Sequence, residues 1–150
     1  MMTLSEAGLR LIQQFEGCRL EAYLDTGGLP TIGWGATRWP DGRRVQLGEA
    51  CSQDQADNLL RHDVAATARA VDDLTVDTIR PEQFEALVSF AFNVGVDAFR
   101  RSTLRQLVNL NPDNPAIREQ FLRWSYDNGQ FVRGLRARRE REAAHYFGGV

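Results

Sequence analysis

Apolar residues recur at helical spacing in the first fifteen positions of the chain. They predict a helix over about 4–15, and Thr3 with Glu6 three residues later predicts a capping box at its start. Residues 17–47 change to the alternation that is typical of strands, with five glycines between positions 27 and 42. This region predicts a small antiparallel sheet with a last short strand around 44–46. No other segment has a strand pattern.

The rest of the pattern is helical. Ser52 with Gln55 forms a second capping box and predicts a helix over about 53–73. At 1.5 Å per residue this helix is roughly 30 Å long, enough to connect two lobes. Pro81 suits the first position of the next helix, the most apolar one, which should form the core of a larger lobe. Further helices are predicted from about residue 99, over 116–124, and from Gly134 towards the end of the chain.

These elements predict one α+β domain over 1–150, mostly helical. A β-containing lobe spans about 13–55, and the helix over 53–73 connects it to an all-helical lobe of about 74–150, which also takes in helix 4–15. No apolar run approaches about 18 residues, and no basic and then apolar leader starts the chain. We therefore expect that the protein does not insert stably into a membrane and that it is synthesised as a cytoplasmic protein.

Charge is unevenly distributed along a chain of net charge −2. From Arg100 onward there are 10 Arg against 5 acidic residues, and Lys is absent from the whole sequence. The basic part either attracts an acidic polymer or reflects compositional bias alone. Negative overall charge without a binding motif argues against nucleic acid. Cys18 and Cys51 have no metal-ligand spacing and are expected as reduced, partly buried thiols, with a bridge after export left open; no metal or cofactor is expected.

The first candidate for chemistry is Glu16, within Phe15-Glu16-Gly17. Gly17 is the residue type that ends helices in a left-handed conformation, so Glu16 should lie in the last helical turn. A carboxylate there meets the negative end of the helix dipole, at a typical cost of about 0.3–1 kcal/mol. Partial burial beside Phe15 adds to that cost. Both effects favour the protonated carboxyl, so Glu16 is a candidate general acid.

The second candidate is Asp25, which begins the turn Asp25-Thr26-Gly27-Gly28 between two strand-like runs. A carboxylate at a hairpin tip is more hydrated than Glu16 and should stay ionised. Two carboxyls in such different environments meet the chemical requirement for hydrolysing a glycosidic bond. One protonates the leaving oxygen, while the other activates water or attacks carbon.

Thr31 and two glycines complete the pattern. The Thr31 hydroxyl could hold the attacking water against Asp25. Gly33 and Gly35 lie two positions apart in a predicted strand, and they lack the side chains that would keep a sugar ring from the backbone.

Glu16, Asp25 and Thr31 occur within two longer motifs, 15–25 and Thr31-Ile32-Gly33-Trp34-Gly35-Ala36-Thr37. This arrangement resembles phage-type lysozymes of glycoside hydrolase family 24. The resemblance implies a lysozyme-like fold, with Glu16 as the general acid, Asp25 assisting the water, Thr31 positioning it, and inversion at the anomeric carbon. Many members carry His where this chain has Ala36, which puts in doubt a structural contact of that His and none of the three catalytic groups.

The resemblance also implies a substrate and a setting. It implies a monomeric endolysin that hydrolyses the β-1,4 bond between N-acetylmuramic acid and N-acetylglucosamine in peptidoglycan, for host-cell lysis. The protein would stay in the host cytoplasm until a holin or another export route released it to the periplasm and cell wall. Two alternatives remain: a lytic transglycosylase, which needs neither Asp25 nor Thr31, and a non-catalytic wall-binding or virion module on the same fold.

Family resemblance extends to binding residues in the second half of the chain. Phe92 and Ser102 lie in stretches similar to those that line the far side of the saccharide cleft, although Phe92 could equally pack in the core. Trp34, Trp124 and Tyr126 are either sugar platforms or core aromatics. The run from Gly134 to Glu142 resembles a late family motif, Gly-Leu-x-x-Arg-Arg-x-x-Glu, and we hypothesise that its Arg136 or Arg139 approaches Glu16.

Overall fold

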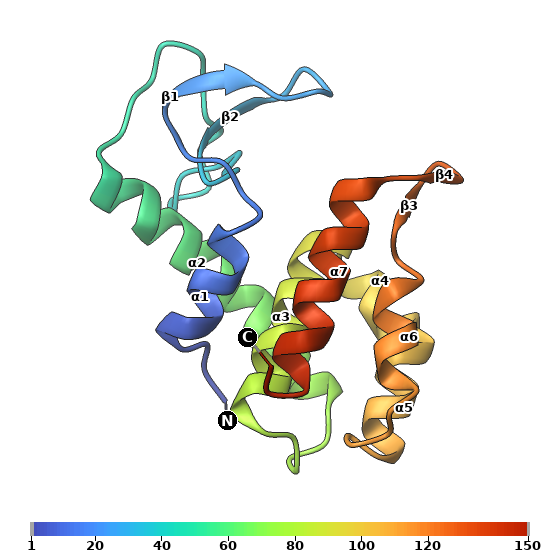
Figure 1. Cartoon of the computed structure of the whole chain (residues 1–150). Coiled ribbons are helices and arrows are strands. Elements are labelled where there is room, and N and C mark those ends of the chain that lie inside the picture. The colour runs from blue at the N-terminus through green and yellow to red at the C-terminus, as the bar shows by residue number, and fades with distance from the viewer. Residues whose placement is uncertain (1, 150) are drawn as a thin grey trace. The chain divides into compact units, whose positions relative to one another are not determined.

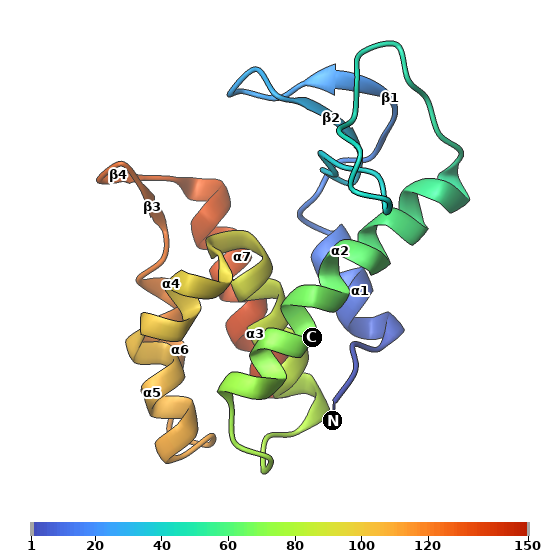
Figure 2. The ribbon, with the colours of Figure 1, turned by 180° about the vertical axis from the view of Figure 1, so that it is seen from behind.

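A computed structural model describes residues 2–149, which divide into two compact units. The first, here called the β unit, is Ile12–Ala66, and the rest of the described chain forms the second, the helical unit. The elements shown in Figures 1 and 2 are α1 (Glu6–Gln13), β1 (Arg19–Leu24), β2 (Pro30–Gly33), α2 (Gln53–Leu74), α3 (Pro81–Val94), α4 (Val96–Arg101), α5 (Thr103–Leu110), α6 (Ile117–Leu122), β3 (Tyr126–Asp127), β4 (Gln130–Phe131) and α7 (Arg133–Tyr146).

The β unit is built on the antiparallel pair β1 and β2, as the alternation predicted. Tyr23 lies opposite Thr31 and Leu24 opposite Pro30, and the register is irregular towards Arg19. The expected strand around 44–46 is wrong, because this segment makes only the isolated bridge between Arg38 and Arg44. Of the three residues only Val45 is buried, so the segment has one inward anchor and no ladder.

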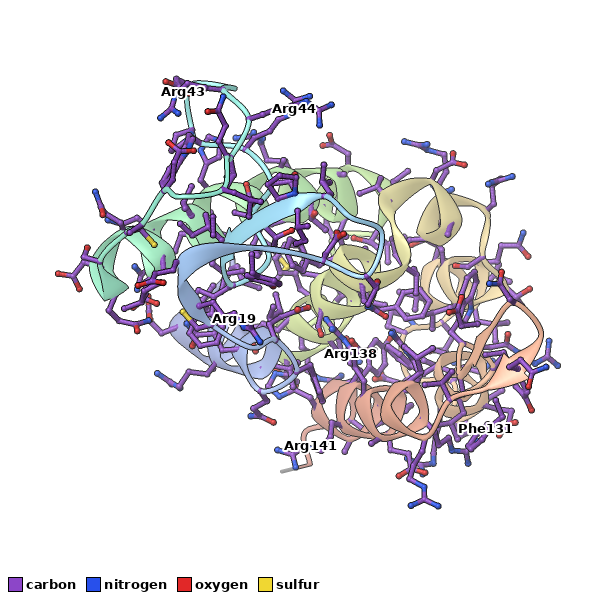
Figure 3. All side chains as sticks on the ribbon, turned by 90° about the horizontal axis from the view of Figure 1, so that it is seen from above. Arg19, Arg43, Arg44, Phe131, Arg138 and Arg141 are labelled. Atoms are coloured by element: carbon purple, nitrogen blue, oxygen red, sulfur yellow. The ribbon has the colours of Figure 1, made fainter. Side chains whose placement is uncertain are left out.

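A small apolar cluster holds this unit together. Ile32, Ala36 and Val45 are buried with Leu59 of α2, and Ala22, Trp39 and Cys51 pack around them. Since the cluster joins the strand pair, the following loop and α2, it fixes the hairpin against the helix. Figure 3 shows Arg43 and Arg44 on the loop after β2, where both side chains are exposed.

Helix α1 is shorter than predicted at both ends. The Ser5 hydroxyl accepts from Gly8 N at 3.2 Å and caps the helix, so the expected capping box at Thr3 is wrong. The helix ends at Gln13, and the N–H of Phe15 bonds to the carbonyl of Ile12 at 3.0 Å in a tighter turn.

The other helices follow the sequence more closely. The reciprocal box between Ser52 and Gln55 is present, with bonds of 3.1 and 2.8 Å, and α2 spans Gln53–Leu74 as predicted. Pro81 is the first residue of α3, which confirms its predicted place. Gly95, with φ of 100°, separates α3 from α4, which begins earlier than the helix expected from residue 99.

A second hairpin, β3 with β4, was not predicted. Asn128 and Gly129 both have positive φ, 50° and 77°, as in a type I′ turn. The rings of Tyr126 and Phe131 meet across the pair with centroids 5.8 Å apart, and both are exposed. The Asn-Gly pair is the sequence signal that identifies this hairpin.

Helix α3 is the core of the helical unit, as its apolar sequence predicted. It lies against α7, which also packs on α6 (Figures 1 and 2). The Phe90 ring is fully buried and makes edge contacts with Phe99, Phe121 and Trp124 at centroid distances of 6.2, 5.7 and 5.4 Å. Among residues 2–149, no helix has both the length and the apolar character required to cross a bilayer.

Buried charges connect α7 to α3. Glu142 is fully buried and accepts from Arg139 at 2.6 Å, from Arg138 at 3.1 Å and from Ser89 at 2.6 Å. Arg138 extends from α7 towards α3 (Figure 3) and donates to the Ser89 carbonyl at 3.1 Å. The Arg139 guanidinium also lies over the Phe90 ring, 5.0 Å from its centroid.

Glu142→Gln should lower the free energy of unfolding by about 3–5 kcal/mol, because it leaves two arginine charges buried without their carboxylate. Urea unfolding followed by circular dichroism measures this loss. The matched control is Glu140→Gln on the same helix, whose ion pair with Arg136 is on the surface and should contribute at most about 1 kcal/mol. Equal losses for the two variants would contradict the prediction.

Glu49 should make the stability of the β unit depend on acid. Hydrogen bonds from Arg43 and Trp39, and then from the Gln46 N–H, lower the pKa of Glu49 from 4.5 to about 2. This stabilisation is therefore present above pH 4.5 and is lost as the pH falls towards about 2. In thermal unfolding over this range, Glu49→Gln should be less stable than the wild type at neutral pH and converge with it in acid. The matched control is Glu21→Gln, which replaces an exposed carboxylate on β1 and should change the stability at neutral pH less than Glu49→Gln does.

Candidate active site

Glu16 is half-buried and lies three residues beyond the end of α1. It is therefore outside the last helical turn, and Gly17 does not adopt the expected left-handed conformation. The sequence argument from the helix dipole is wrong for this reason. What lies beside the carboxyl is the loop after β2: a Cβ built on Gly35 would be 4.0 Å from Glu16 Oε2.

That loop is the tight turn Gly33-Trp34-Gly35. Ile32 and Ala36 close it with reciprocal backbone hydrogen bonds of 2.9 Å each. Gly33 and Gly35 have φ of 66° and 107°, conformations that residues with a side chain rarely adopt. Gly33 thus ends β2 and Gly35 lies in the turn, so the two are not neighbours on one face of a continuous strand as the sequence suggested.

The two glycines differ in their surroundings. Gly33 is buried, and a Cβ there would lie 3.3 Å from Cβ of Ala56 on α2, so close packing is a sufficient reason for glycine. Gly35 is exposed and borders Glu16. Of these two glycines, Gly35 is therefore the one that presents exposed backbone next to the candidate acid.

Asp25 is held by its own turn. Its Oδ1 accepts from the N–H groups of Gly27 at 2.9 Å and Leu29 at 2.8 Å, while its carbonyl accepts from Gly28 N at 2.9 Å. Its Oδ2 accepts no hydrogen bond from any residue that the structure describes. One oxygen is thus used to orient the carboxylate and the other can bind a water molecule.

Thr31 is 4% exposed and lies on β2, two residues after Leu29. Its hydroxyl donates to the Leu29 carbonyl at 2.9 Å. Because that bond uses the only proton of the hydroxyl, its lone pairs remain to accept from another donor such as water. Leu29 therefore connects Thr31 to Asp25, through its carbonyl on one side and its N–H on the other.

The other predicted binding residues belong to the helical unit. Phe92 is half-buried on α3. Ser102 is buried and caps α5, accepting from Arg105 N at 3.1 Å and donating to the Phe99 carbonyl at 2.7 Å. It also lines a cavity of about 410 Å³, together with Arg101, Thr103, Gln120, Arg123 and Trp124. Sequence reasoning missed Gln120 and Arg123, which carry no motif and meet Ser102 only through packing of α6 near α5.

Arg136 and Arg139 have acidic partners within α7 itself. Arg136 pairs with Glu140 at 2.9 Å and Arg139 with Glu142 at 2.6 Å. Their approach to Glu16 stays a prediction. Cys18 and Cys51 are half-buried free thiols, and burial raises the pKa of Cys51. No group of three potential metal ligands occurs among the described residues.

The sequence is similar to a known protein family and to several of its members. A family model described as phage lysozyme matches residues 13–142. The endolysin of Bacillus phage B103 is 39% identical over 150 residues, covering 99% of this chain and 55% of that protein. The endolysin of Salmonella phage P22 is 35% identical, covering 96% of this chain and 97% of that protein. Thus the chain spans about half the length of the Bacillus phage relatives and nearly all of the Salmonella phage relative.

Solved structures agree with the sequence comparison. The endolysin from Escherichia coli O157:H7 phage FAHEc1 matches with a TM-score of 0.91 at 36% identity, covering 99% of this chain and 96% of that one. A P22 lysozyme mutant matches with a TM-score of 0.87 at 33% identity, covering 98% of this chain and 99% of that one. The expected α+β, lysozyme-like fold is confirmed, and the chain belongs to the phage lysozyme family.

Proposed function

We propose that this protein is an endolysin that hydrolyses the β-1,4 bond between N-acetylmuramic acid and N-acetylglucosamine in peptidoglycan. Family membership supports the lysozyme class of reaction. The observation that carries the mechanism is the link through Leu29, which couples a carboxylate and a hydroxyl, each with free acceptor capacity. Such a pair can hold one water molecule by two hydrogen bonds.

In the proposed mechanism, Glu16 protonates the glycosidic oxygen as the bond to the anomeric carbon breaks. Asp25 Oδ2 and Thr31 Oγ1 accept the protons of a water molecule, which attacks that carbon from the opposite face. Asp25 takes up a proton as the new C–O bond forms. Attack opposite to the leaving group inverts the configuration, and no covalent intermediate forms.

Substrate binding is proposed for both units. The exposed backbone at Gly35 lets a sugar ring approach beside Glu16, with Gly33 supporting the same turn. In the helical unit, Phe92 and the cavity that contains Ser102 would hold further parts of the polymer. Trp124 supplies an aromatic wall to that cavity, and aromatic faces suit the apolar faces of pyranose rings.

We propose the biological setting as well. The protein acts as a monomer without a cofactor, as a single lysozyme-like domain whose lobes correspond to the β unit and the helical unit. It stays in the host cytoplasm until a holin or another route releases it to the cell wall, where it lyses the host. A lytic transglycosylase would need Glu16 but not Asp25 or Thr31. A non-catalytic module would need none of the three residues.

Glu16→Gln should lower turnover of purified peptidoglycan by at least about a hundredfold, because it removes the transferable proton while keeping the shape of the side chain. Release of reducing ends measures the rate, and circular dichroism checks the fold. Glu21→Gln, in the same unit, should keep wild-type activity. If Glu16→Gln retained more than about a hundredth of the rate, acid catalysis by Glu16 would be refuted.

Asp25→Asn should abolish water activation while leaving the turn intact, because the amide keeps an acceptor oxygen for Gly27 and Leu29. We expect a loss of at least about a hundredfold. Asp41→Asn is the matched control, since Asp41 also accepts a turn N–H, from Arg43 at 2.9 Å.

The products of the wild-type enzyme test the reaction type. Proton NMR should show reducing sugars that form first as the α anomer, as inversion requires. Anhydro-sugars would establish a transglycosylase instead, initial β anomer would refute inversion, and no cleavage would leave a binding module.

A further inference from the structure

The turn Gly33-Trp34-Gly35 has an anchor that the proposed mechanism does not use. Trp34 Nε1 donates to Asp57 Oδ1 at 2.8 Å, and Asp57 lies in the second turn of α2. The same oxygen accepts from Gln53 Nε2 at 3.0 Å, one helical turn earlier. Asp57 is half-buried. Its carboxylate accepts one hydrogen bond from its own helix and one from the indole.

Backbone packing at the turn reinforces this contact. Gly33 lies directly against Ala56, the residue before Asp57, so backbone and side chain of the turn rest on one stretch of α2. On the other side of Trp34, Gly35 borders Glu16 Oε2. Two residues with positive φ flank Trp34, and glycine gives such a turn little intrinsic rigidity. The Ile32–Ala36 hydrogen bonds hold the base of the turn, and the Trp34 indole is the side chain that holds its tip against α2.

We infer that Asp57 is a positioning residue for the candidate acid: it fixes the Trp34 indole, and through it the Gly35 backbone that borders Glu16. This inference rests on the proposed function of Glu16, but the hydrogen bond itself can be tested separately. Asp57 acts through Trp34 and needs no contact with substrate. Because small displacements at a reacting centre reduce rates strongly, loss of this anchor should lower kcat more than it raises KM.

The kinetic test uses four variants. Asp57→Ala and Trp34→Phe should each lower kcat by about tenfold with KM changed less than twofold, and the double variant should lose no more than either single one. Asp57→Asn should restore most of the rate, since its amide oxygen still accepts from the indole. The matched control is Asp54→Ala, which removes an exposed carboxylate from the first turn of the same helix and should keep wild-type kcat.

An independent readout is hydrogen exchange at the Trp34 indole N–H. Its NMR signal is assigned as the indole signal that is missing in Trp34→Phe. Exchange should be faster in Asp57→Ala than in the wild type and near wild type in Asp57→Asn, with the indole of Trp39 unchanged because it donates to Glu49. The inference is overturned if the losses in kcat add in the double variant, if Asp57→Asn is as slow as Asp57→Ala, or if indole exchange does not respond.

Failure of the proposed function looks different. In that case the wild type releases no reducing ends, while the exchange result still reports whether Asp57 anchors the turn. If Asp57→Ala does not fold, Asp57→Asn and Trp34→Phe still test the inference. A kcat near wild type in Asp57→Asn together with a lowered kcat in Trp34→Phe requires the hydrogen bond.

Discussion

The candidate chemistry depends on the hydrogen bonds within the turn from Asp25 to Leu29. The hairpin that carries them has strands of six and four residues and an irregular register, so strand pairing alone gives it little rigidity. The Asp25 side chain compensates by accepting two turn N–H groups. One carboxylate oxygen thus supports the fold and the other is left for solvent. The arrangement explains why an acidic residue in this turn need not be mobile.

The helical unit is stabilised differently, by charges inside an aromatic core. Glu142 and Arg139 are fully buried, and Arg139 lies against the same Phe90 ring that contacts three other aromatic side chains. Burying such groups is costly, and the cost is offset only when nearly every donor and acceptor is paired. The basic residues near the end of the chain are therefore not one solvated face. Arg138 and Arg139 are structural, while Arg141 is exposed.

Sequence reasoning succeeded where local signals and burial agree. The box at Ser52 and the proline at position 81 fix where α2 and α3 begin, and both helices bury an apolar face. It failed at the end of α1, because Gln14 and Phe15 fit a helix by pattern while the chain turns there towards β1. The second hairpin was missed because each strand is only two residues long, too short for alternation. For the site, the motif proposed Asp25 and Thr31 together, whereas the hydrogen bonds that both make to Leu29, and the bond from Trp34 to Asp57, depend on contacts that no motif encodes.

The three residues proposed for chemistry lie in one uninterrupted stretch, Ile12–Ala66, while Phe92 and the Ser102 cavity lie outside it. In the proposed function, the groups that transfer protons thus come from one stretch of the chain, whereas the groups that bind the polymer come from both units. In the proposed function, a substitution around the Ser102 cavity would change how the polymer is held, while the candidate acid, the candidate water site and their supporting turn keep every contact described above. Recognition and reaction could then evolve at different rates within one short chain.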